Sequence, residues 1–241
     1  MDTFPVEFFD LLSPEIRRLV DDGALPQFTT PHWTPVAVMQ DVMPISRAVD
    51  CVALLERSLL PHLKLMEKPI PADSISGMTE NYSEKLPKTV RVRSAMLAPS
   101  KSKAAGIAHE IGLTQMLQSE SLWQFAQAIT GRKLLREVGC QAICYGRGDY
   151  SGPHNDHHPE EEHLRNGYVD VHIMFNTEGV YSQWLVYEQS SYLSEAVELN
   201  SASGVAFYLL PFWHYTTPLI AKIGREADAR RWLLLSSFVL A

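Results

Sequence analysis

The sequence predicts an α+β fold, in which a helical N-terminal part packs against a C-terminal β-sandwich or jelly roll. Apolar residues recur at helical spacing before residue 131, and short β-rich runs punctuated by Gly, Asn, Pro and Ser follow it. The chain has 241 residues, 46% hydrophobic and 20% charged, which is enough to bury the core of one large globular domain. We therefore expect a mainly helical support region over 1–130 and a β-rich core over 131–241, together forming one compact domain.

Helix signals are clearest at three places in the N-terminal part. Ser13 followed by Pro14 combines a capping side chain with a proline at the first helical position. Ser119 can cap a helix that ends near Gly131. Between them, residues 45–60 carry an apolar stripe at helical spacing, made of Ile45, Val49, Val52, Leu55 and Leu59.

Strand signals begin near residue 89 and dominate after residue 131. Residues 89–97 alternate valine with arginine, which is typical of a strand with one solvent-facing side. Residues 69–84 are typical of a loop, and 101–118 of a further helical stretch. The remaining β-rich runs are 138–145, 168–175, 181–187, 205–210 and 232–240. Short strands at this spacing favour a sandwich or jelly roll over a parallel α/β sheet.

Charge and cysteine content argue against several protein classes. A formal net charge of −7 disfavours non-specific nucleic-acid binding, which depends on Lys and Arg neutralising phosphates. No apolar stretch approaches the length of a membrane-spanning helix, and the acidic start lacks the basic region of a secretory signal. Three cysteines form no disulfide framework, and we expect Cys140 and Cys144 to be buried, inert thiols. These features predict a cytoplasmic protein with neither a membrane nor a nucleic-acid partner.

The residues that carry chemistry are His154, Asp156 and His214. Two imidazoles and one carboxylate form the facial triad that holds Fe(II) and leaves coordination positions open. Because side chains alternate along an extended strand, His154 and Asp156 are expected to point to the same side. His214 follows the apolar run 205–210 and would approach from a neighbouring strand. The spacing alone makes these three residues candidate metal ligands, and the alternative is that the hydrophilic run 153–163 is an exposed polar loop.

Three segments around this trio resemble the Fe(II)/2-oxoglutarate-dependent oxygenases, in particular their prolyl-hydroxylase-like branch. Residues 144–156, Cys-Tyr-Gly-Arg-Gly-Asp-Tyr-Ser-Gly-Pro-His-Asn-Asp, resemble that family's Tyr-x-x-Gly approach to its His-x-Asp motif. Residues 171–176 resemble its apolar strand ending in Tyr-Leu-Asn, and 204–219 resemble its Gly, Phe and His-x-Val-x-Pro-Val segment. The resemblance implies a double-stranded β-helix (jelly-roll) core, the trio as Fe(II) ligands, and 2-oxoglutarate and O2 as cosubstrates.

The same resemblance implies a basic residue on the last strand that binds the far carboxylate of 2-oxoglutarate. Arginine suits this role because its planar guanidinium matches a carboxylate bidentately. Arg225, Arg230 and Arg231 are the candidates, and Arg231 best matches the start of the last apolar strand. Arg231 lies farther from His214 than is usual in the family, so we expect a lengthened hairpin between them. Tyr145 is the candidate hydrogen-bond donor to the same cosubstrate.

We interpret the chain as a dioxygenase that hydroxylates an unactivated C–H of a peptide residue, of prolyl type, or of a small amino-acid-like molecule. The alternatives are a jelly-roll metal-binding protein or metalloenzyme that does not use 2-oxoglutarate, and a catalytically silent relative whose N-terminal half binds a partner. His172 shares strand parity with Asp170 and Met174, and we expect it inside the barrel rather than among the metal ligands.

Overall fold

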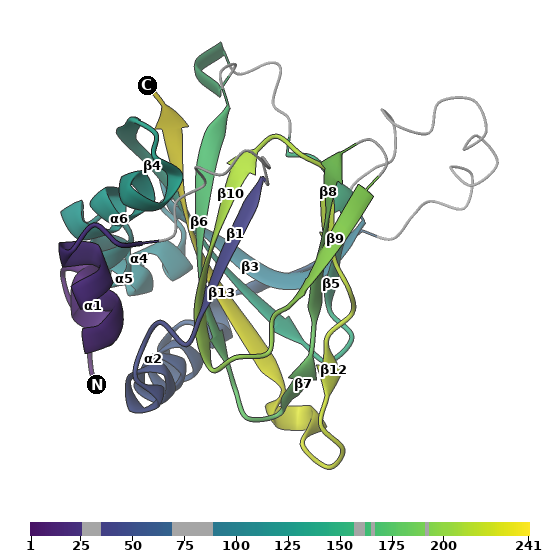
Figure 1. The fold of residues 1–241 in the computed structure, drawn as a ribbon. Helices are drawn as coiled ribbons and strands as arrows, with labels where there is room; N and C mark the ends of the chain where they lie inside the picture. The colour runs from purple at the N-terminus through teal and green to yellow at the C-terminus, as the bar shows by residue number, and fades with distance from the viewer. Residues whose placement is uncertain (26–34, 69–88, 157–161, 165–166, 191–192) are drawn as a thin grey trace.

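The computed structural model describes residues 1–25, 35–68, 89–156, 162–164, 167–190 and 193–241, and its fold is an antiparallel jelly roll with helices packed on one side (Figure 1). The helices are α1 (Pro14–Asp21), α2 (Ile45–Ser58), α4 (Lys103–Glu110), α5 (Leu113–Leu117) and α6 (Glu120–Thr130). Short 3-10 helices span Phe8–Leu11, Leu60–His62, Glu162–Leu164 and Glu226–Asp228. The main-sheet strands are β1 (Val36–Gln40), β2 (Lys64–Lys68), β3 (Val90–Ala98), β4 (Leu134–Gly146), β5 (Tyr150–His154), β6 (Tyr168–Asn176), β8 (Trp184–Ser190), β9 (Leu193–Glu198), β10 (Ser203–Leu210), β11 (His214–Thr216) and β13 (Arg230–Leu240). A small second sheet pairs β7 (Val180–Ser182) with β12 (Ile220–Ala221).

The strand order explains how one sheet encloses an interior. The order is β1-β10-β6-β13-β4-β3-β5-β11-β8-β9, with β2 added on β3. In Figure 1, β10, β6 and β13 form the wall that carries the helices, while β5, β8 and β9 form the facing wall. The prediction of a jelly-roll core from short, regularly spaced strands is confirmed.

The helix-bearing wall is buried on both of its faces. Alternate residues of β6 point outward to the helices, and the residues between them point into the barrel. Its outward set belongs to the large helix–sheet core and comprises Val169, Val171, Ile173 and Phe175. Its inward set comprises Asp170, His172 and Met174, so the predicted parity of His172 is confirmed. The same alternation on β13 sends Trp232 and Leu234 outward and Leu233 and Leu235 inward.

The N-terminal part supplies strands as well as helices. Before residue 131 the described chain holds β1, β2 and β3, of which only β3 was predicted, over 89–97. β1 pairs with β10 at one edge of the sheet, and β3 lies between β4 and β5. The expectation of a helical and irregular N-terminal hundred residues was therefore incomplete, because β1 and β2 form by pairing with strands that are distant in the sequence, β10 for β1 and β3 for β2. The predicted boundary at 130/131 stays a prediction, and the predicted loop over 69–84 lies outside the described residues.

The helices begin and end close to the predicted signals. Ser13 caps α1 by accepting a hydrogen bond from the Ile16 N–H (3.3 Å), and α6 ends at Gly131 in the left-handed conformation. The stripe predicted for α2 is only partly correct, because Ile45 and Val49 are 71% and 57% exposed. The buried stripe of α2 is rotated toward Ala48, Cys51, Val52, Leu54 and Leu55. Within the described parts of the chain, no helix is long and apolar enough to cross a membrane.

The cysteines are structural. Cys51, Cys140 and Cys144 are all buried, and none forms a disulfide. Burial raises the pKa of the Cys140 thiol to about 11 and that of Cys144 to about 12, so both stay protonated at neutral pH. The prediction of buried, inert thiols is confirmed.

Replacing Ser119 tests how the N-terminal segment is joined to the fold. The Ser119 hydroxyl caps α6 by accepting from the Leu122 N–H (3.3 Å) and also accepts from the buried Phe8 N–H (3.2 Å). We expect Ser119→Ala to lower the free energy of unfolding by about 1–3 kcal/mol, because both donors lose a partner. Urea denaturation measures the change. The matched control is Ser13→Ala, since α1 buries no residue and its cap accepts one bond; equal losses in the two variants would contradict this account.

Candidate metal centre

A cavity of about 720 Å³ opens inside the barrel, and the three predicted metal ligands lie in its wall. Its remaining lining comes mainly from inward-facing residues of β4, β6 and β13. Cavities of this size hold cofactors and small-molecule substrates in many proteins. The structure thus places the trio where a ligand can reach it.

Strand pairing brings the two histidines together. His154 is the last residue of β5 and His214 the first residue of β11, and the two are direct partners in the antiparallel register. Their ring centroids lie 4.2 Å apart. Residues sixty positions apart in the chain therefore become neighbours on one face of the sheet.

Asp156 reaches the same point by a turn. The expectation that His154 and Asp156 project together from one extended strand was wrong, because β5 ends at His154 and Asp156 has a φ of 50°. Aspartate tolerates this left-handed conformation better than most residues do. Tyr168 holds the turn by donating its hydroxyl hydrogen to the Asp156 carbonyl oxygen (2.8 Å). The side chain of Asp156 is thereby directed back at the two imidazoles.

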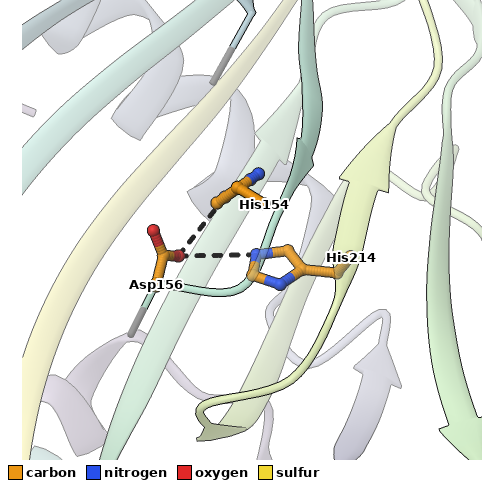
Figure 2. A group of neighbouring side chains, drawn as sticks. All are labelled: His154, Asp156 and His214. Atoms are coloured by element: carbon orange, nitrogen blue, oxygen red, sulfur yellow. Dashed lines mark ion pairs between the residues drawn. The ribbon is translucent and has the colours of Figure 1, made fainter. Parts of the chain in front are cut away.

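The ligand atoms converge as a metal site requires. The Asp156 Oδ2 lies 3.3 Å from Nε2 of His154 and 3.6 Å from Nε2 of His214 (Figure 2). All three residues offer a ligand atom within 4.8 Å of the others. Nitrogen and oxygen ligands bound about 2.0–2.2 Å from one ion lie roughly 3 Å apart, so the observed spacing fits a single divalent cation.

Backbone hydrogen bonds fix the tautomer of both imidazoles. The Nδ1 of His154 lies 2.6 Å from the Gly152 carbonyl oxygen, and the Nδ1 of His214 lies 3.0 Å from that of Phe212. A carbonyl oxygen only accepts, so each Nδ1 must carry the hydrogen and donate it. In the neutral imidazole the lone pair is then on Nε2, the atom that faces Asp156 in each case. The donor set and its geometry fit a bound divalent metal.

Gly152 allows β5 to lie where it does. Its N–H donates to the Thr89 carbonyl oxygen (2.7 Å), and a Cβ added at Gly152 would approach that oxygen to 2.8 Å and overlap the Thr89 hydroxyl. Only glycine permits this approach. The N-terminal part therefore helps to position the carbonyl that orients His154.

Arg231 is the buried cation beside the cavity. Its side chain is fully buried, and on β13 it has the same parity as the cavity-lining Leu233. Its Nη1 donates to the Gln183 Oε1 (3.0 Å), its Nη2 lies 3.3 Å from the Met174 sulfur, and its Nε has no partner. No carboxylate of the described residues lies within ion-pair distance of it. Burial lowers the pKa of Arg231, as expected for a cation removed from water without a counter-ion.

The other two candidate arginines already have carboxylate partners. Arg230 faces the opposite side of β13 and lies 3.4 Å from Glu56 of α2. Arg225 lies in an exposed loop and pairs with Glu178 at 2.9 Å. Only Arg231 of the three is directed toward the cavity and lacks an acidic neighbour among the described residues.

Tyr145 lies between Arg231 and the cavity. It is the direct partner of Arg231 across β4 and β13, and the guanidinium carbon lies 5.2 Å from the centre of its ring. Tyr145 also lines the cavity. Burial raises the pKa of Tyr145, so its hydroxyl remains a neutral donor at neutral pH. The two predicted cosubstrate residues are thus adjacent in the structure.

Three residues that shape the site were not predicted from the sequence. Tyr168 supports the Asp156 turn, Gln183 orients Arg231, and the ring of Tyr208 lies 5.3 Å from that of His214. Tyr168 begins the apolar run 168–175 and Tyr208 lies within the run 205–210, both with inward parity, and this signal could have identified them. Gln183 lies between β7 and β8 and carries no such signal.

Removing a ligand tests the metal centre directly. We expect His214→Ala to weaken Fe(II) binding by more than about 100-fold, because it removes one of the three candidate protein ligands. Anaerobic equilibrium dialysis measures the dissociation constant. His172→Ala is the matched control, since it removes a buried imidazole from the same cavity wall. Similar losses in both variants would exclude the assigned ligand set.

Tyr168 allows a milder test of the same geometry. We expect Tyr168→Phe to weaken Fe(II) binding by about 10–100-fold, as is usual when a group that orients a metal ligand is removed. The circular dichroism spectrum should stay unchanged, because the ring still fills its place. Unaltered metal affinity would mean that the hydroxyl does not position Asp156.

No protein-family model matches the chain, and a comparison with curated proteins finds no match either. Solved structures do match. The non-heme alpha-ketoglutarate-dependent carbocyclase SnoK of nogalamycin biosynthesis is 12% identical, with a TM-score of 0.53 over 99% of this chain and 87% of that one. The epimerase SnoN of the same biosynthesis is 11% identical, with a TM-score of 0.52 over 94% of this chain and 84% of that one.

A prolyl-4-hydroxylase from Pseudomonas putida superposes less closely. It is 15% identical, with a TM-score of 0.47 over 92% of this chain and 97% of that one, and it adds nothing to the assignment. At such low identities the likeness to SnoK and SnoN establishes the fold alone. The chain has the jelly-roll fold of these non-heme alpha-ketoglutarate-dependent enzymes.

Proposed function

We propose that the protein is an Fe(II)- and 2-oxoglutarate-dependent dioxygenase that hydroxylates an unactivated C–H of a small amino-acid-like molecule or of a peptide residue. Three findings support this: the shared fold, the converging His–Asp–His set, and the buried Arg231 beside the same cavity. The metal ligands alone would also fit an enzyme that does not use 2-oxoglutarate. The oxygenase is favoured because Arg231 is buried beside the cavity and has no carboxylate partner among the described residues.

A buried guanidinium without a counter-ion is costly. Moving a charged side chain out of water costs several kcal/mol unless an opposite charge and hydrogen bonds replace the lost hydration. Arg231 has one amide oxygen and one thioether as acceptors, and its Nε has none. A ligand carboxylate would supply the missing charge and accept the free N–H groups bidentately. The proposal therefore assigns Arg231 and Tyr145 to the far carboxylate of 2-oxoglutarate.

In this proposal each residue has a defined task. His154, Asp156 and His214 would hold Fe(II) as its three protein ligands. With Fe(II) bound, 2-oxoglutarate and O2 supply the oxidation, in which 2-oxoglutarate becomes succinate and CO2 and the substrate C–H becomes C–OH. The chain contributes orientation and exclusion of water, through inward-facing side chains such as Ile143, Leu233 and Leu235.

Replacing Arg231 tests whether the protein is a 2-oxoglutarate-dependent oxygenase or a metalloenzyme that does not use 2-oxoglutarate. We expect Arg231→Met to raise the dissociation constant of 2-oxoglutarate by more than about 30-fold, because a charge-assisted bidentate contact is lost. The stability of the ligand-free protein should fall little or even rise, since an unpaired buried charge is replaced by an apolar chain. The first effect is measured by titrating 2-oxoglutarate into the anaerobic Fe(II) protein and following the weak visible charge-transfer band; the second is measured by urea unfolding.

Arg230→Met is the matched control for this experiment. It removes the neighbouring arginine on the other face of β13, whose partner is Glu56. It should leave the 2-oxoglutarate titration unchanged. If wild-type protein shows neither the band nor 2-oxoglutarate-dependent succinate release with any tested amino acid or peptide, the oxygenase proposal fails. If Arg231→Met binds 2-oxoglutarate as wild type does, the assignment of Arg231 fails.

A further inference from the structure

A second polar group lies in the cavity wall, apart from the metal ligands and from Arg231. It consists of Asp170 and His172 on β6 with Ser237 on β13, and all three line the cavity. Asp170 and Ser237 are direct partners across the two strands, and the Ser237 hydroxyl donates to the Asp170 Oδ1 (2.6 Å). We refer to these three residues as the β6 polar subsite.

His172 is the unusual member of the β6 polar subsite. It is only 7% exposed, and neither of its ring nitrogens has a hydrogen-bond partner. Its Nε2 lies 3.9 Å from the Asp170 Oδ2, which is too long for a hydrogen bond. An imidazole buried in this way costs free energy, because both of its polar atoms are removed from water without a protein hydrogen-bond partner. A bound ligand would supply the missing partner.

The β6 polar subsite is close to the metal centre. The ring of Tyr208 lies 4.1 Å from that of His172 and 5.3 Å from that of His214. One aromatic ring therefore separates the subsite from a metal ligand. A small molecule held by Asp170 and His172 can present a neighbouring carbon at the metal.

The charges of the cavity identify the class of ligand. Among the described residues, no Lys or Arg lines the cavity or lies within ion-pair distance of Asp170, and the basic group near it is the His172 imidazole, with Nε2 3.9 Å from Oδ2. In the proposed holoenzyme, the charges of Fe(II) and Arg231 balance those of Asp156 and of the 2-oxoglutarate dianion. Asp170 then remains as the uncompensated charge of the lining, which attracts a cation and repels an anion.

We propose that the β6 polar subsite binds a protonated amine of the substrate, with Asp170 pairing the ammonium group and His172 accepting one of its N–H bonds. The inference names the substrate class of the proposed oxygenase and so rests on that proposed function. The apolar lining, including Ile143, Leu233 and Leu235, covers the hydrocarbon part of the same molecule. Substrate with a carboxylate in place of the amine is rejected by Asp170.

Three probes of the same shape test the inference: cyclohexylmethylamine, cyclohexylmethanol and cyclohexanecarboxylate. Each is titrated calorimetrically at pH 7.5 into the anaerobic protein loaded with Fe(II) and 2-oxoglutarate. We expect the amine to bind at least about tenfold more tightly than the alcohol, and the carboxylate to bind most weakly, because a hydrogen bond between two charged groups is stronger than one to a neutral group. An alcohol that binds as tightly as the amine, or no binding by any probe, overturns the inference.

The Asp170→Asn variant tests whether Asp170 causes the preference for the amine over the alcohol. The asparagine oxygen still accepts from Ser237 but carries no charge, so the amine-to-alcohol ratio should fall to about two or less. Glu178→Gln is the matched control, because it removes one carboxylate from an exposed loop remote from the cavity lining. It should keep the wild-type ratio. A preference that persists in Asp170→Asn overturns the inference.

The same samples keep the two proposals apart. The charge-transfer band of Fe(II) with 2-oxoglutarate reports the proposed function, and the amine-to-alcohol ratio reports the subsite. A band without an amine preference refutes the subsite alone. An amine preference with neither the band nor 2-oxoglutarate-dependent succinate release refutes the oxygenase and leaves Asp170 as an amine-binding residue in a protein with another function.

Discussion

The pairing of β5 with β11 is the constraint on which the rest of the site depends. It sets His154 opposite His214, and it leaves Asp156 to complete the set from the turn that follows β5. Strand pairing and a side-chain hydrogen bond together position each histidine. Each imidazole donates to a carbonyl two residues earlier in its own chain segment, so the backbone that forms the sheet also fixes the tautomer. The geometry of the candidate metal centre is therefore set by the geometry of the sheet.

In the described parts of the chain, the α-helices support the site without lining its cavity. They cover the outward residues of β6 and β13, so this face of the wall is shielded from water. The alternate, inward-facing residues of the same strands can therefore be polar while the wall keeps an apolar core on its other side. Arg231, Asp170 and His172 occupy such inward positions. A β-sheet wetted on its outer face would lose the apolar support that holds these costly side chains in place.

Much of this arrangement follows from local sequence patterns, and the rest does not. Strand parity separates Arg231 from Arg230 and places His172 inside the barrel, because alternation is a property of any extended chain. The short strands β1, β5 and β11 have no comparable signal, since they form through pairing with distant segments. The left-handed turn at Asp156 was missed for the same reason. Its conformation depends on the Tyr168 hydroxyl, which comes from a separate strand.

Gln183 and Met174 hold the Arg231 guanidinium in a fixed position before a ligand binds. Gln183 is oriented by donating its own N–H groups to the carbonyls of Asp149 and Thr217, so its oxygen faces the guanidinium. The Met174 sulfur is a weak acceptor. These contacts hold the guanidinium in place but do not neutralise it, whereas a carboxylate at either position would both hold and neutralise it.

Along β13, Arg231 and Ser237 lie on the same face with their Cα atoms roughly 20 Å apart. The barrel wall therefore presents an uncompensated positive charge near one end of this strand and, through Asp170, a negative charge near the other, so two ligands of opposite charge are drawn to different places.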